Sequence, residues 1–113
     1  MVNTKSKGNR VQRQAIAKLE NEGWHVSKVE AGGKFEKNKD MFNLYDLCAV
    51  RGPECKFVQV TTNRPHKHGD YEHFSKKHQI PGVKHIQFVW YDRKGWKIFT
   101  YHNGKKTVED LRK

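Results

Sequence analysis

The chain has 113 residues, a length at which one domain can bury one core but two domains could not each bury their own. Lysine and arginine outnumber aspartate and glutamate by 23 to 12, which gives a formal net charge of +11. An excess of this size favours a polyanionic partner, because basic groups near phosphates release condensed counterions, and nucleic acid is the partner we expect. Thirteen large aromatic residues, six Phe, four Tyr and three Trp, can supply a small core and argue against a disordered chain.

No apolar run approaches the roughly 20 residues that a membrane-spanning helix needs, and the basic first residues lack the apolar stretch of a secretion signal. We therefore expect an intracellular protein, in the cytoplasm or nucleoid, with no membrane partner. In that compartment Cys48 and Cys55 stay reduced, so we expect no structural disulfide.

The first part of the chain predicts a helix and a strand. Residues 1–8 (MVNTKSKG) are basic or small and polar, and they predict a flexible basic arm in front of a single domain over 9–113. From Asn9 on, apolar residues recur at spacings of three and four, which predicts an amphipathic helix that Gly23 ends. Residues 24–29 alternate loosely between apolar and polar, as in a strand.

A long loop, a hairpin and a second helix are expected next. Residues 30–43 hold two adjacent glycines and a polar run and predict a loop, and long loops in small domains are often functional. Residues 44–50 (LYDLCAV) and 56–62 (KFVQVTT) predict the two strands of a hairpin. Residues 63–69 (NRPHKHG) predict a basic loop, and residues 70–79 predict a short helix.

The C-terminal part predicts two further strands, over 85–91 and 96–101, joined by a turn at 92–95, and a last short helix from Thr107. The three tryptophans occupy strand positions, and we assign them to the core rather than to base stacking. The element order is α-β-β-β-α-β-β-(α), which predicts an α/β domain with a central mixed sheet flanked by helices.

Asp46 interrupts the apolar segment 44–50. A carboxylate there costs several kcal/mol to desolvate unless it is paired, exposed at a strand end or bound to a metal ion, so a paired or solvated acid and a metal ligand are both open interpretations. Gln59 and Thr61 share one face of the next strand, and across a hairpin that face can be the one that Asp46 occupies. Mg²⁺ at this spot would bind the Asp46 carboxylate, the Gln59 side-chain oxygen, the backbone carbonyl of Val60 and several waters.

Three segments carry a resemblance to a known family: KGNRVQRQAIAKLENEGWHV, DMFNLYDLCAV and, after a turn, KFVQVTT. Over residues 7–101 the chain resembles the Holliday-junction-resolvase-like branch of the PD-(D/E)xK, or restriction-endonuclease-like, nucleases. The resemblance implies an αβββαβ core, in agreement with the element order above. It also implies hydrolysis of phosphodiester bonds with Mg²⁺ or Mn²⁺, double-stranded or branched DNA as the partner, and a homodimer.

Carried over residue by residue, the family's aspartate at the start of the second strand is Asp46. The family's first-helix acid falls on Gln12, the acid of its acid-x-Lys pair on Gln59, and its lysine on Thr61. In the family the acids hold the cation and the lysine stabilises the charge on the phosphate. The resemblance therefore implies catalytic roles for Asp46, Gln59, Thr61 and Gln12, and metal binding by Asp46, Gln59 and Val60, from an incomplete motif.

Neighbouring side chains could replace the groups that the motif lacks. Lys67 or Lys76 could bring a positive charge to Thr61, and Asp40 or Glu72 could replace a missing carboxylate. The competing interpretation gives Lys76 to a solvated or phosphate-binding helix face and makes Asp40 a loop residue bonded to its own turn.

Two basic groups border the predicted site, and we expect both to bind DNA phosphates. They comprise Lys5, Lys7 and Arg10 near the start of the first helix, and Arg64, His66, Lys67 and His68 after the Gln-x-Thr strand.

The sequence thus predicts a DNA-binding, Mg²⁺-dependent endonuclease that resembles the Holliday junction resolvases. The alternative is a catalytically degenerate module of the same fold that binds DNA or a protein partner without cleavage, which the loss of three of the four motif side chains favours. A basic RNA-binding protein of unrelated fold fits only if the expected element order is wrong.

Overall fold

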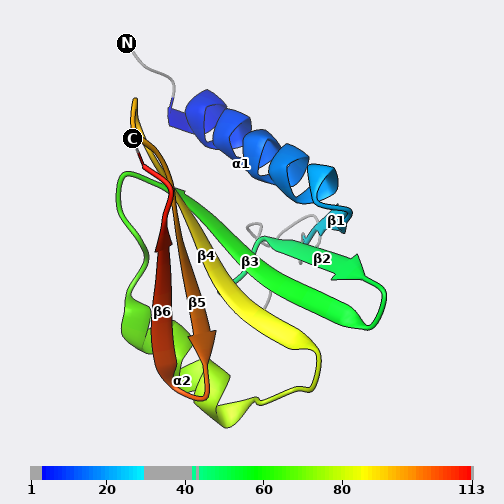
Figure 1. Cartoon of the computed structure of the whole chain (residues 1–113). Coiled ribbons are helices and arrows are strands. Elements are labelled where there is room, and N and C mark those ends of the chain that lie inside the picture. The colour runs from blue at the N-terminus through cyan, green and yellow to red at the C-terminus, as the bar shows by residue number, and fades with distance from the viewer. Residues whose placement is uncertain (1–3, 30–41, 43, 113) are drawn as a thin grey trace, which may run out of the picture.

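The computed structural model describes residues 4–29, 42 and 44–112 (Figure 1). Its elements, in chain order, are α1 (Thr4–Asn21), β1 (His25–Lys28), β2 (Leu47–Arg51), β3 (Glu54–Thr62), α2 (His68–Lys77), β4 (Val83–Tyr91), β5 (Gly95–His102) and β6 (Lys105–Asp110). The strands form one sheet in the order β1-β2-β3-β4-β5-β6. β1 to β3 and β4 to β6 are two antiparallel meanders, and they meet where β3 and β4 pair in parallel. A parallel pair needs a crossover connection, and α2 provides it.

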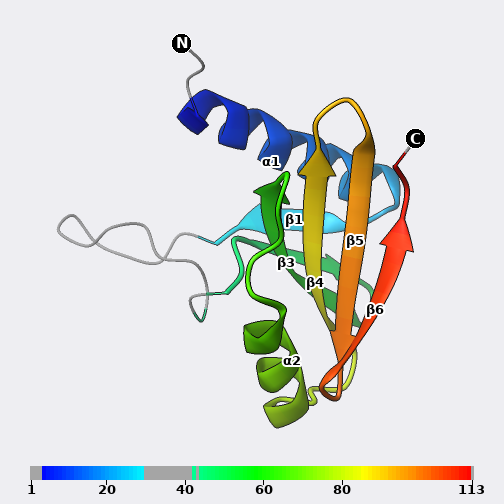
Figure 2. The same cartoon turned by 90° about the vertical axis from the view of Figure 1, so that its left-hand side faces the viewer.

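The two helices cover opposite faces of the sheet, because successive residues of each strand point to opposite sides. Ile86 and Phe88 of β4 pack with Leu19 of α1 in one apolar cluster. Val89 packs with Tyr71 of α2 in the other. Figure 2 shows α1 crossing the sheet near one end of the strands and α2 lying near the other end.

The first helix is longer than expected. α1 begins at Thr4, so residues 4–8 are helical and do not belong to a flexible arm. Its buried side comprises Val11, Ala15 and Leu19, four residues apart, each at most 1% exposed. Apolar periodicity detects only this buried stripe, whereas the preceding turns rely on the helix propensity of residues such as lysine.

The helix expected from Thr107 is wrong, because residues 105–110 form β6, antiparallel to β5. Asn103 and Gly104 make the connection with φ angles of 50° and 79°. Asn-Gly favours the two-residue hairpin turn in which both central residues have positive φ. All six residues of β6 are exposed, so the segment KKTVED lacks the apolar alternation that marks a half-buried strand.

The cysteines and tryptophans lie on strands of the sheet or directly beside one. Cys48 and Cys55 are free thiols on β2 and β3, with their sulfur atoms 3.7 Å apart. Trp24 is buried, as expected, whereas Trp90 and Trp96 are only half-buried and pack edge to face with ring centroids 5.1 Å apart. Neither of the described helices is long and apolar enough to cross a membrane.

We expect opposite effects from alanine at two glycines. Gly82 has a φ of 81°, and an added Cβ would lie 2.7 Å from the backbone oxygen of Pro53. Gly82→Ala should lower the free energy of unfolding by at least about 1–2 kcal/mol, because the left-handed conformation alone costs that much. Gly69 lies in α2 and has no described atom within 4 Å of an added Cβ, so Gly69→Ala should raise stability by up to about 1 kcal/mol. Urea unfolding of both variants checks this, and a Gly82→Ala protein as stable as the wild type would contradict it.

Candidate functional site

The backbone holds Asp46 directly before β2, where α1, β1 and β3 come together. Its amide donates to the Val58 carbonyl and its carbonyl accepts from the Val29 amide, each at 3.0 Å. Leu47 pairs with the same Val58, so two consecutive residues oppose one residue of β3, as in a β-bulge. Bulges redirect side chains, and the Asp46 carboxylate meets α1: Nε2 of Gln12 donates to its Oδ2 at 3.1 Å.

Tyr45 anchors Asp46 from the preceding position. Its ring is fully buried, and its hydroxyl lies 2.9 Å from Nδ1 of His85. Nε2 of His85 lies 3.3 Å from the carbonyl of His78 and therefore carries the ring proton, so Nδ1 accepts from the tyrosine. Burial lowers the pKa of His85 and raises that of Tyr45, which keeps both groups neutral. The expected strand over 44–50 begins only at Leu47, so Asp46 stands half-buried at a strand start and avoids full desolvation.

Gln59 and Thr61 point to the face of the sheet opposite α1. The alternating residues Val58 and Val60 point the other way and pack in the apolar cluster that includes side chains of α1. Gln59 is 5% exposed, and its amide nitrogen lies 3.4 Å from Nε2 of His66. The buried hydroxyl of Thr61 has no hydrogen-bond partner within the described part of the chain. Such a group costs about 1–3 kcal/mol, which a bound ligand or water at this position would offset.

Thr61 also lines a hollow of about 500 Å³. Its walls come from the end of β3 and the loop before α2: Val60, Thr61, Thr62, Arg64, Pro65, His66 and Lys67. The three ionisable residues among them are basic or histidine and are exposed. The hollow therefore presents donors and positive charge, as a site for a phosphate requires.

Gln87, which the sequence analysis did not single out, fixes the loop that carries these basic groups. It is fully buried in β4, and its Oε1 accepts from the His66 amide at 2.9 Å. Its Nε2 lies 3.2 Å from the His66 carbonyl and 2.8 Å from the Tyr101 hydroxyl, and donates to both. Gln59 is the register partner of Gln87, so two neighbouring glutamines hold His66. In the sequence, this role could have been suspected from the one polar residue within the apolar run over 86–90 (IQFVW).

The end of the same loop is tied to β5. Nδ1 of His68 lies 2.6 Å from the Tyr101 hydroxyl. Burial lowers the pKa of His68 and raises that of Tyr101 to about 12, so both are neutral at pH 7. Because the hydroxyl accepts from Gln87, its own proton is available to His68.

Two of the residues proposed as compensating groups lie away from the hollow. Lys67 borders it together with Thr61. The stem of Lys76 instead packs against Gly104 at the β5–β6 turn. Glu72 is half-buried on α2, and no described hydrogen bond or ion pair joins its carboxylate to Thr61.

The N-terminal basic residues lie on α1. Arg10 is exposed, and Lys5 and Lys7 belong to the first two turns of that helix. Asp40 lies outside the described residues.

The structure thus brings Gln12 to Asp46 and Gln59 to His66. The two pairs lie on opposite faces of the sheet, because the Asp46 carboxylate meets α1 and the Gln59 side chain points away from α1. Within the described ranges, no three His, Cys, Asp or Glu side chains gather closely enough to hold a metal ion. Mg²⁺ commonly takes one or two carboxylates together with waters and substrate phosphates. The Asp46 carboxylate could serve as one such ligand, but the Gln59 side chain points to the other face of the sheet, so these two side chains do not converge on one ion.

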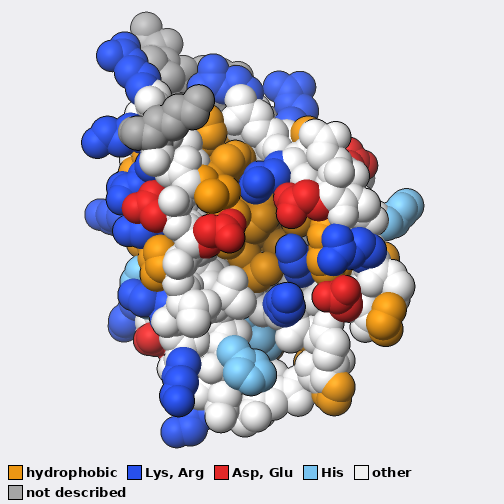
Figure 3. Space-filling view, viewed as in Figure 1, with side chains coloured by type: hydrophobic (Ala, Val, Ile, Leu, Met, Phe, Trp, Pro, Cys, Tyr) orange, Lys and Arg blue, Asp and Glu red, His pale blue; other side chains and the backbone are white. Residues whose placement is uncertain are grey.

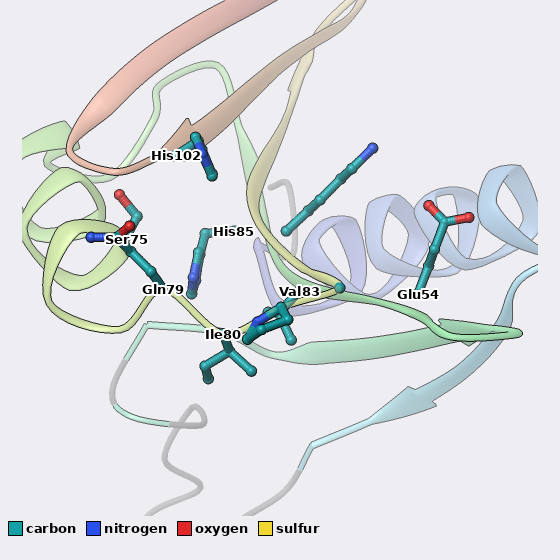
Figure 4. Close-up of a pocket in the computed structure, with 10 residues that line it drawn as sticks. Glu54, Ser75, Gln79, Ile80, Val83, His85 and His102 are labelled. Carbon is teal, nitrogen blue, oxygen red and sulfur yellow. The ribbon is translucent and has the colours of Figure 1, made fainter.

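A second hollow, of about 370 Å³, lies at the far end of α2 (Figure 4). In Figure 4, Ser75, His85 and His102 gather at one end and Glu54 lies at the other. Its walls combine acidic, basic and apolar side chains, and no predicted site residue that the structure describes is among them. The hollow beside Thr61 is therefore the better match for an anionic ligand.

The two hydrogen bonds from Gln87 to His66 lead to a prediction. Gln87→Met should leave the His66 amide and carbonyl unpaired, lower the free energy of unfolding by about 1–3 kcal/mol and accelerate hydrogen exchange at the His66 amide. Gln79→Met, at an exposed position, should change stability by less than about 0.5 kcal/mol. Urea unfolding and amide exchange measured by NMR check this. Unchanged exchange at His66 would show that Gln87 does not hold the loop.

No family model matches this sequence, and no curated protein matches it. Among solved structures, the chain is similar to Hjc of Archaeoglobus fulgidus, described as a Holliday junction resolvase from an archaeal hyperthermophile, with a TM-score of 0.56 and 17% sequence identity. The match covers 91% of this chain and 88% of that chain. The expected αβββαβ order is confirmed, and the chain has the α/β fold of the resolvase-like nucleases.

Proposed function

We propose that this protein binds double-stranded or branched DNA and hydrolyses its phosphodiester bonds with Mg²⁺ or Mn²⁺. The hydrogen bond between Gln12 and Asp46 carries the proposal. These residues stand 34 positions apart in the sequence, and the resemblance assigns both of them to the catalytic site, one from a helix and the other from the start of a strand. Chance similarity gives no reason for them to meet. The described activity of Hjc, resolution of Holliday junctions, supports a four-way junction as the substrate.

The proposal gives a role in the reaction to each of the following side chains. Asp46 would hold the cation together with waters and substrate phosphate oxygens, and the cation when bound supplies Lewis acidity and lowers the pKa of a bound water. Gln12 orients the Asp46 carboxylate through the bond at 3.1 Å. Lys67, on the rim of the hollow beside Thr61, replaces the positive charge of the missing motif lysine.

The DNA phosphates would be bound on both sides of this site. One group is the exposed part of the loop before α2, with Arg64, His66 and Lys67, followed by His68 at the start of α2. The other is the N-terminal part of α1, with Lys5, Lys7 and Arg10. We further propose that a homodimer acts on the junction, since a two-fold assembly presents two equal sites to a symmetric substrate, and that it does so inside the cell.

The second candidate function is a module of the same fold that binds DNA or a protein without cleavage. The neutral side chains at three of the four motif positions, Gln12, Gln59 and Thr61, favour it. A lone carboxylate binds a divalent cation more weakly than a pair does. In the nuclease Asp46 binds the metal ion that cleavage requires, whereas in the binding module the loss of its charge would not affect any reaction.

The first test removes the charge of Asp46. Purified protein should cleave a labelled four-way junction in Mg²⁺ or Mn²⁺, and Asp46→Asn should lower the rate on the order of 100-fold because the metal ligand is lost. Glu20→Gln, an equal change of charge at an exposed position of α1, should leave the rate unchanged. Tight, salt-sensitive binding without cleavage in either metal would refute the nuclease and favour the binding module.

A further inference from the structure

Two lysines of the C-terminal hairpin converge over a single aromatic ring. Lys97 of β5 and Lys106 of β6 place their Nζ atoms 5.4 and 5.6 Å from the ring centroid of Phe99. The ring is only 4% exposed, so it forms a floor beneath two charged groups. The cation–π contacts restrain the two ammonium groups without neutralising their charge.

No described carboxylate forms an ion pair with either lysine. Asp110 is the register partner of Lys97, but its two oxygens are bound by Arg112 at 2.8 and 2.7 Å. Arg112 is thus the main partner of Asp110, and Lys97 makes a smaller contribution to lowering the pKa of that carboxyl. Both ammonium nitrogens lie within 5.6 Å of the same ring centroid, and their like charges repel one another, so a bound anion would reduce this cost.

These lysines continue the basic loop before α2. The ring of His68 lies 4.6 Å from that of Phe99, and Lys97 and Lys106 both contribute, after burial, to lowering its pKa, while Glu72 acts in the opposite direction. Figure 3 shows lysine and arginine side chains along the margin of the molecule where β6 and the loop before α2 lie in Figure 1.

We propose that Lys97 and Lys106, the β5–β6 basic strip, bind the phosphate backbone of DNA beside the stretch held by the loop over 63–67. The strip lies outside the predicted cleavage site and extends the interface across the C-terminal hairpin. The proposal rests on the DNA binding proposed above, and it names a second contact region for it. Phosphate oxygens fit two unpaired ammonium groups because they accept hydrogen bonds from both and release counterions on binding.

The salt dependence of DNA binding tests the contribution of the strip. Lys97→Gln/Lys106→Gln should flatten the plot of log affinity against log salt by about two units and weaken junction binding at low salt roughly tenfold, because two phosphate contacts are lost. Lys28→Gln/Lys84→Gln removes the same charge at exposed positions elsewhere and should leave the slope unchanged. Circular dichroism confirms that each variant is folded. Equal effects of the two double variants would mean that only net charge matters, and would overturn the strip.

The same titration separates this inference from the proposed function. Arg64→Gln/Lys67→Gln alters the loop instead. If that variant flattens the slope while Lys97→Gln/Lys106→Gln does not, the strip is refuted and DNA binding through the loop stands. If the strip variant flattens the slope but the wild type cleaves nothing, the nuclease fails and the strip stands. A wild type that binds neither junction nor linear duplex at low salt overturns both.

Discussion

The paired glutamines at the centre of the parallel strands determine how the rest of the candidate site is arranged. Gln59 and Gln87 are register partners, and both are nearly or fully buried. A buried amide is costly unless it is hydrogen-bonded, and Gln87 meets that requirement with the backbone of His66. The connection between β3 and α2 is thereby held against the sheet rather than extending into solvent. Arg64 and Lys67 lie on either side of His66, so their backbone is held in place as well.

The distribution of charge around this anchor explains how one small domain can combine a core with a net charge of +11. The interior of the sheet is apolar on the side of α1 and aromatic on the side of α2, where tyrosine hydroxyls are paired with neutral histidines. Neither cluster contains a lysine or arginine, and the cationic groups that approach the clusters, such as those of Lys97 and Lys106, lie over a ring at the margin. The protein can therefore present positive charge to a polyanion at no cost in core packing.

Much of the fold followed from the periodicity of the sequence, and the failures have physical causes. The seven elements from α1 to β5 have the expected order and type because their apolar residues recur at the helical or strand period. β6 was missed because an exposed edge strand carries no apolar pattern, although Asn103 and Gly104 were a recognisable turn. For the site, the resemblance selected Gln12 and Asp46, which the structure joins. Gln87 was not predicted as a functional residue, because the sequence does not show whether a polar residue within an apolar strand faces solvent or is buried under a helix.

The charges of β6 have one more consequence. β6 is the last strand of the sheet, so the outer side of its backbone has no neighbouring strand among the described residues. An open edge of this kind invites pairing with the edge of another molecule and growth into aggregates. The segment KKTVED places lysines and acids along that edge, and their desolvation would oppose edge-to-edge stacking. Lys106, which we assign to a nucleic-acid surface, is one of these charges and would therefore also oppose self-association of the isolated protein.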